Sequence, residues 1–375
     1  MSDVAKTDDR RLFLATARAA RGEHYLALAI GAVSLLAFIA IVPFARVPLA
    51  KMPAFIPSYE AALFFIDLIT AVLLFDQFVR LRSIGILALA SGYLFDAFII
   101  VPHALSFPGA FSLTGLLGAQ AQTTAWLYVF WHGGFSLFVI AYVLLRNRED
   151  EARRSRAVAR AGWTIVAATL AVAALVLALT LLATWGHDIL PIVMQGGDYS
   201  LLVSKGISPA VWALTLLAMG ALWPRRRHVL DLWLMLAMWI WLFDIALSAV
   251  IGASRFDLGF YAGRVFGLIA ASFLLITLVV EMARMHAGAL GAAASAEQRL
   301  AEQRLSELTR VRRHVDSNEG GPARGEHAAS FIHRQNIAHY RLLLESEPLD
   351  DDRRRLIEKL LLEEEAADKP GDVPH

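Results

Sequence analysis

The sequence predicts an all-α, polytopic membrane protein: a bundle of about eight transmembrane helices with both termini in the cytoplasm, followed by a small cytoplasmic helical tail. The first observation is a series of eight apolar stretches. Most are close to the roughly 20 residues needed to cross a hydrocarbon core about 30 Å thick. The second is that Lys and Arg gather in alternate loops, sixteen on one side of the bundle against five on the other. Basic loops stay in the cytoplasm, so the second observation sets the orientation.

The spans follow one another with short connections. They are predicted at residues 25–44, 60–79, 83–102, 125–145, 163–185, 208–223, 229–252 and 263–283. Helix is expected in each because hydrocarbon offers an open backbone no hydrogen-bond partner. The sixth span is the shortest. The predicted location is the bacterial inner membrane, with the lipid bilayer as the surrounding partner.

Composition supports this class and excludes others. Hydrophobic residues make up 57% of the chain and charged residues 18%, below the roughly 25% charged residues of soluble domains. The net charge of +1 predicts no nucleic-acid partner. The chain has no cysteine, which excludes disulfides, thiolate metal sites and thiol catalysis.

The chain is predicted to contain four parts. Residues 1–22 form an amphipathic cytoplasmic arm in which no signal peptide is expected. Residues 23–285 form the eight-helix transmembrane domain, residues 286–321 a signalling helix and linker, and residues 322–375 a cytoplasmic helical hairpin.

Ionisable residues inside the spans indicate a site. A charge near the bilayer centre costs at least about 2.5–3.5 kcal/mol, so such residues tend to be functional. One predicted depth, about two helical turns from the outer surface, holds Asp67, Asp96, His132 and Asp244. Others, among them Tyr261 and Arg264, lie at the outer rim. We therefore predict a polar pocket open to the periplasm. Its candidate ligand-binding residues are Asp67, Asp96, His103, His132, Asp244, Tyr261 and Arg264.

The residue types leave several occupants open. Such a pocket could hold a cation, a metal, a cofactor or a small polar ligand. His103 and His132 are the candidate metal ligands, and with the carboxylates they would suit Zn²⁺, Cu²⁺ or haem. The sequence requires no cofactor. Alternatively, the acids pair with His or Arg and form a purely structural polar network.

Two other features carry predictions. Near the cytoplasmic side, Asp76 and Asp231 are expected to form salt bridges with Arg80 and the basic turn 225–227. The uncharged outer loop 103–124 is long enough to suggest a functional segment and is expected to cap the pocket.

Aromatic residues follow that loop. Trp126 and Trp131 are expected in an aromatic belt at the membrane interface.

Several segments together resemble a known family. They read PFARVPLAKMPAFIP, DLITAVLLFDQF, LASGYLFDAFIIVPHALSFPGAF, GLLGAQAQTTAWLYVFWHGGF and RFDLGFYAGRVFGLIAASFLL. Over about residues 20–285 the chain resembles the fourth class of bacterial membrane-associated sensor domains, the MASE group. The positions that match its motifs are Asp67, Gln77, Asp96, Pro102, His103, Gln122, Trp126, Trp131, His132, Asp257, Tyr261 and Arg264.

The resemblance implies a sensory input module, usually followed by a diguanylate cyclase or a histidine kinase. Neither output is found here, because the tail of about 90 residues holds only Glu319-Gly320-Gly321 of a cyclase turn and no ATP-binding boxes. No enzymatic activity is therefore expected. We predict a protein that senses a periplasmic or membrane stimulus and signals to a separate cytoplasmic protein. The alternatives are a membrane-embedded metal- or haem-binding redox enzyme and a small-solute transporter.

The tail has its own pattern. Beyond the last span an irregular apolar stripe runs through Leu300, Leu305, Leu308, Val311 and Val315, which suggests a homodimer formed through the tail. Two further helices, at about residues 327–346 and 350–367, are expected to form the hairpin. A two-helix hairpin buries little apolar area alone, so we expect it to associate with itself or with a partner. The residues of its second helix that should face the first are Ile357, Leu360 and Leu361.

Overall fold

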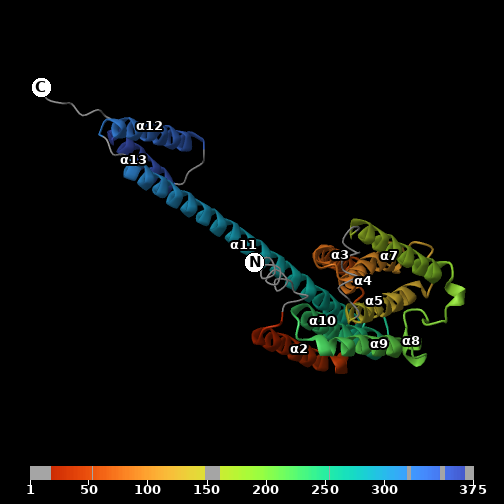
Figure 1. The fold of residues 1–375 in the computed structure, drawn as a ribbon. Helices are drawn as coiled ribbons and strands as arrows, with labels where there is room; N and C mark the ends of the chain where they lie inside the picture. Colours follow the sequence, from red (N-terminus) through yellow and green to blue (C-terminus); the bar gives the residue numbers. More distant parts are fainter. Residues whose placement is uncertain are drawn as a thin grey trace. The chain divides into compact units, whose positions relative to one another are not determined.

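The computed structural model describes residues 18–52, 54–147, 161–252, 254–318, 322–346 and 351–367, and the regular elements in these ranges are helices. The chain divides into two units, one up to His286 and one from Ala287 onward. Each unit is described by itself, with the labels of Figure 1. The long helices of the first unit are α2 (Arg21–Ile41), α3 (Phe55–Leu81), α4 (Ile84–Ser106), α5 (Thr123–Asn147), α7 (Ala161–Thr184), α9 (Ile207–Leu222), α10 (Val229–Ile245) and the start of α11 (Leu258–Asn318).

Within the described residues, eight helices are long and apolar enough to cross a membrane. They coincide with the eight predicted spans, and the sixth, Ile207–Arg225, is the shortest with 19 residues. The protein is thus a multi-pass membrane helix bundle, as the sequence predicts. Most of the predicted arm lies outside the described residues, and α2 already begins at Arg21.

Two helices form the centre of the bundle. In the most apolar 18-residue stretch of each span, 72% of the residues of α4 and 78% of those of α10 with its continuation are buried inside the protein. The corresponding shares are 6% for the span of α2 and 11% for α7. In Figure 1, α2 packs on α10, and α7 packs on α4 and α5. Glycines allow the central helices to approach closely, because a Cβ on Gly92 of α4 would lie 2.7 Å from the Cβ of Phe138 in α5. The outward-facing helices expose apolar side chains, as a lipid solvent requires.

Backbone hydrogen bonds tie together the connecting segments at one end of this unit. We call it the outer end, because the charge count predicts that it faces the periplasm. The amide of Leu49 donates to the carbonyl of Phe256 (2.8 Å), and the amide of Arg255 donates to the carbonyl of Gly197 (3.1 Å). Phe256 adopts a left-handed backbone with φ +70°, which is uncommon for a bulky residue. The segment before α11 is therefore held from two sides.

The opposite end carries the second set of acids. Asp231 is fully buried, lies 3.5 Å from both Arg225 Nε and His228 Nδ1, and accepts a hydrogen bond from the Tyr142 hydroxyl. Asp76 pairs with Arg80 at 2.8 Å. The predicted salt bridges at this end are confirmed for both acids.

The second unit holds the tail helices. The helices α12 (Pro322–Ser346) and α13 (Asp351–Ala367) pack against each other, close to the predicted ranges. The predicted contact residues Ile357, Leu360 and Leu361 are half-buried. No residue of α13 is fully buried, so the hairpin has little core of its own.

Polar contacts join the two tail helices. Glu364 of α13 is hydrogen-bonded to the His333 ring and accepts from the Asn336 side chain at 3.0 Å. Partial burial alone would raise the pKa of Glu364, but the hydrogen bonds from His333 and Asn336 outweigh it and hold that pKa below its ordinary value.

Acid is expected to loosen this hairpin. A depressed folded-state pKa stabilises the fold above the unfolded-state value, about 4.3 for Glu, and that stability is lost as the pH falls through the folded-state pKa. The protection factors of backbone amides in residues 331–346 of the full-length protein, measured by hydrogen exchange, should therefore fall below about pH 4.3. In Glu364→Gln this fall should be smaller, since the titrating group is gone. An equal fall in both proteins would show that Glu364 does not link the helices.

Candidate functional site

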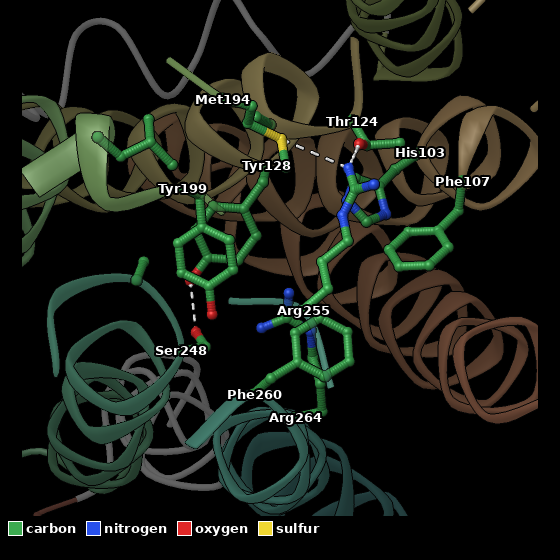
Figure 2. Close-up of a pocket in the computed structure, with 13 residues that line it drawn as sticks. His103, Phe107, Thr124, Tyr128, Met194, Tyr199, Ser248, Arg255, Phe260 and Arg264 are labelled. Carbon is green, nitrogen blue, oxygen red and sulfur yellow. Dashed lines mark hydrogen bonds between the residues drawn. The ribbon is translucent and has the colours of Figure 1, made fainter. Parts of the chain in front are cut away.

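A small polar cavity lies at the outer end of the bundle. Its volume is about 40 Å³, and several elements supply its walls (Figure 2). Its polar lining side chains are His103 from α4, Thr124 and Tyr128 from α5, Tyr199, Ser248 from η6 (Ala246–Ile251), Arg255, and Arg264 from α11. The segment η6 is a π-helical turn that continues α10, and such turns are frequent at functional sites.

Asp244 connects three helices behind this cavity. Its carboxylate lies 3.3 Å from His132 Nε2 on α5 and 3.4 Å from Arg264 Nη1 on α11. Ser248 donates to the same carboxylate at 3.1 Å, and its hydroxyl is also 2.9 Å from the Tyr128 hydroxyl. All of these side chains are buried. The structure therefore brings three of the predicted site residues together in one network, which balances the charge of Arg264.

Glycines on α11 make this approach possible. A Cβ on Gly263 would lie 2.9 Å from Asp244 Oδ1, and one on Gly267 would lie 2.9 Å from Asp244 Oδ2. Any larger residue at either position would push α11 away from the carboxylate. The two glycines are therefore part of what allows the network to form.

His103 forms a separate buried pair. Its Nδ1 lies 2.7 Å from Glu60 Oε1, and both side chains are almost inaccessible. His103 also lines the cavity, so this ring contacts both the hollow and a buried carboxylate. The pairing is the arrangement expected of a structural polar network, and a ligand contact for His103 stays a prediction.

Asp67 and Asp96 do not line the cavity. They are buried on α3 and α4 and lie close enough to interact electrostatically, and the Trp131 indole is beside Asp96. Within the described ranges, Asp67 Oδ1 and both carboxylate oxygens of Asp96 meet no hydrogen-bond partner. These two acids form a second polar centre, separate from the network around Asp244.

The Tyr261 side chain forms hydrogen bonds to the backbone of the segment before α3. Its hydroxyl donates to the carbonyl of Ala50 (2.8 Å) and accepts from the amide of Met52 (3.2 Å). It does not line the cavity. Tyr261 thus anchors the segment before α3, and a ligand contact for it also stays a prediction.

The uncharged outer loop lies at the outer end of the bundle. A second hollow of about 690 Å³, which we call the outer bowl, is walled mainly by residues 107–121 and shares Phe107 and Arg255 with the inner cavity. The loop thus lies beside the inner cavity, and its role as a cap stays a prediction. The aromatic-belt prediction is wrong for Trp126 and Trp131, because both are buried. The indole of Trp126 donates to the Pro191 carbonyl at 3.1 Å instead of reaching the interface.

The histidines are not arranged around a metal. In the part of the chain that the structure describes, no group of three or more His, Cys, Asp or Glu side chains is placed to hold an ion. His103 and His132 each face a different carboxylate, Glu60 and Asp244.

Several residues of the site are not among those that the sequence predicts, and two of them, Glu60 and Arg255, have an acidic or a basic side chain. Glu60 stands at the outer boundary of the second predicted span, and a carboxylate at the first turn of a span is itself a signal. Arg255 is one of only five basic residues on the outer side, but nothing in its neighbourhood in the sequence distinguishes it from the other four. Hydrogen bonds from distant segments turn it inward.

The fold and the site define a class: a multi-pass integral membrane protein with a small cavity at one end of its helix bundle. The comparison with family models then identifies the family. Residues 50–286 match MASE4, the membrane-associated sensor, integral membrane domain, so the chain belongs to this family of sensor domains. No curated protein and no solved structure matches the chain significantly. The match covers the bundle from just before α3 to the end of the first unit, and it leaves out α2 and the tail.

Proposed function

We propose that the protein is a sensory input protein of the bacterial inner membrane. It detects a periplasmic solute in the inner cavity and signals to a separate cytoplasmic protein through its tail, as a homodimer. Family membership supports the sensory role. The observation that carries the proposal is the continuity of α11, which supplies Arg264 to the cavity wall and runs without a break to Asn318.

Exposed apolar side chains support an association through the tail. Leu300, Leu305, Leu308 and Val311 on α11 are each more than half exposed. At 100° per residue these positions fall on one broad face of the helix. A helix that exposes such a face is typical of signalling helices that pair with a second copy.

The absence of cysteine allows a direct test of the homodimer. A single cysteine in Leu308→Cys should form an intermolecular disulfide in isolated membranes, because it lies on the apolar face. The matched control is Ser306→Cys, which lies roughly 160° away around the helix and should cross-link far less. Equal cross-linking at both positions would contradict a defined dimer face.

The same reporter tests the signal. Ala249→Met places extra volume into the wall of a cavity of about 40 Å³ and so imitates an occupied site. We expect it to change the rate of Leu308→Cys cross-linking at least severalfold. Ala210→Met, the same change on an exposed position of α9, is the control. If neither substitution alters the rate, the cavity does not communicate with the tail and the sensory proposal fails.

A further inference from the structure

Two arginines, Arg255 and Arg264, line the inner cavity, and among its described lining residues none is Asp or Glu. The outer bowl adds Lys51 and likewise has no acidic lining residue among those described. In Figure 2, the side chains of Arg255 and Arg264 extend into the same hollow from different parts of the chain.

Arg255 is the decisive residue. Its guanidinium donates to the Thr124 hydroxyl, contacts Met194 Sδ at 3.5 Å and lies 5.0 Å from the Phe107 ring centroid. Within the described residues it pairs with no carboxylate. The nearby Asp257 instead accepts from the backbone amides of Phe260 (2.7 Å) and Ser254 (3.3 Å).

This guanidinium stays charged at neutral pH. Burial lowers the pKa of Arg255 to about 10, and the neighbouring Arg264 acts in the same direction. A charge removed from water without a partner is costly. The cavity therefore needs an anion that the described residues do not supply.

Arg264 has donor capacity left over. Asp244 contacts only its Nη1, at 3.4 Å, while its guanidinium lies 4.9 Å from the ring centroids of both Tyr128 and Phe260. Its Nε is buried and, in the described part of the protein, has no hydrogen-bond partner. Asp244 neutralises Arg264, so the positive charge of Arg255 remains uncompensated.

The dimensions select the size of the anion. A single water needs about 10–15 Å³ of such volume, so about 40 Å³ accommodates a group of three or four non-hydrogen atoms. Planar guanidinium groups match the two oxygens of a carboxylate. The outer bowl, at about 690 Å³, is in the range of small-molecule sites.

We propose that this site binds a small organic acid, with its carboxylate in the inner cavity between Arg255 and Arg264 and its remaining atoms toward the outer bowl. Arg255 contacts both hollows and is the residue on which recognition depends. The assignment of this anion as the stimulus rests on the sensory function proposed above, whereas its binding does not.

Thermal unfolding of the detergent-purified full-length protein tests the binding. Sodium salts of acetate, pyruvate, succinate and benzoate are compared with nitrate and phosphate at constant ionic strength. A ligand that binds only the folded state raises the unfolding temperature with concentration. We expect at least one carboxylate to do so in the unaltered protein, with at least tenfold weaker apparent affinity in Arg255→Gln and no change in Lys205→Gln, an exposed outer-end control.

The outcomes separate the possibilities. No shift with any carboxylate, or an equal shift in Arg255→Gln, overturns the proposal, and a shift by nitrate or phosphate alone assigns the site to inorganic oxyanions instead. If Arg255→Gln does not fold, Arg255→Lys is the second variant, because it keeps the positive charge but cannot donate two parallel hydrogen bonds to a carboxylate. Unchanged carboxylate affinity in Arg255→Lys would overturn the proposed bidentate contact.

The cross-linking reporter separates this failure from failure of the sensory function. If carboxylate binds but leaves Leu308→Cys cross-linking unchanged, the anion site is supported and the proposed signalling from cavity to tail is refuted. If Ala249→Met changes cross-linking but no carboxylate binds, the signalling is supported and the anion site is refuted.

Discussion

Replacing Asp244 by Ala is expected to be among the most destabilising single changes in the bundle. The substitution removes the side-chain partner of His132 and the only carboxylate within 4 Å of Arg264 among the described residues, whereas Ser248 keeps the backbone carbonyl of residue 244 as an acceptor at 2.7 Å. Breaking a buried ion pair from one side typically costs about 3–5 kcal/mol, because the remaining charge is left uncompensated. Unfolding of the detergent-purified protein, followed by tryptophan fluorescence, measures this loss.

A matched control exists in the same chain. Asp76 also pairs with an arginine, Arg80 at 2.8 Å, but both side chains are about half exposed. Exposed pairs contribute at most about 1 kcal/mol, so Asp76→Ala should change stability little. If the two alanine substitutions lowered stability equally, the network around Asp244 would not hold the outer end together.

The network around Asp244 is the part of the site that is most predictable from the sequence. A span has a known rise per residue, so depth along the membrane normal follows directly from the position of each residue in its span. Asp244 and His132 are predicted at one depth and Arg264 at the outer rim, and Asp244 contacts both of the other two. The number and the positions of the spans need only apolar length, and the eight candidate spans of the described residues agree with them.

Depth does not determine rotation about a helix axis, and this limits prediction from the sequence. Asp96 and Asp244 end similar tetrapeptides, residues 93–96 and 241–244. Asp244 nevertheless meets His132 and Arg264, whereas Asp96 lies near Asp67 and Trp131. The rotation of each helix is set by close contacts with its neighbours, such as Gly92 against Phe138.

The position of Arg255 is unpredictable for a different reason. It depends on backbone hydrogen bonds from Arg255 to Gly197 and from Leu49 to Phe256, residues that are far apart in the sequence. No local pattern indicates such contacts. The same holds for Trp126, which composition assigns to the interface but whose indole bonds to the Pro191 carbonyl inside the protein.

At the opposite end, Asp231→Ala is the second change expected to have a large effect. Asp231 has no exposed surface, accepts from the Tyr142 hydroxyl and lies 3.5 Å from Arg225 Nε. Its loss should destabilise the bundle by about 3–5 kcal/mol, by the argument used for Asp244. Tyr142→Phe removes the hydrogen bond donated to Asp231 and the one accepted from Arg146. It should cost about 1–3 kcal/mol, since it leaves a buried acceptor. Tryptophan fluorescence during unfolding measures both.

The double variant distinguishes a network from two independent contacts. Tyr142 and Asp231 share a hydrogen bond, so their combined cost should be less than the sum of the single costs. Additive costs would mean that the two side chains stabilise the bundle separately.

Because Asp231 belongs to the end opposite the cavity, its loss should leave the carboxylate affinity of the folded fraction unchanged. The same substitution can be combined with Leu308→Cys. If the folded protein still binds carboxylate but its cross-linking no longer responds to it, the cluster around Asp231 lies in the path from the cavity to the tail.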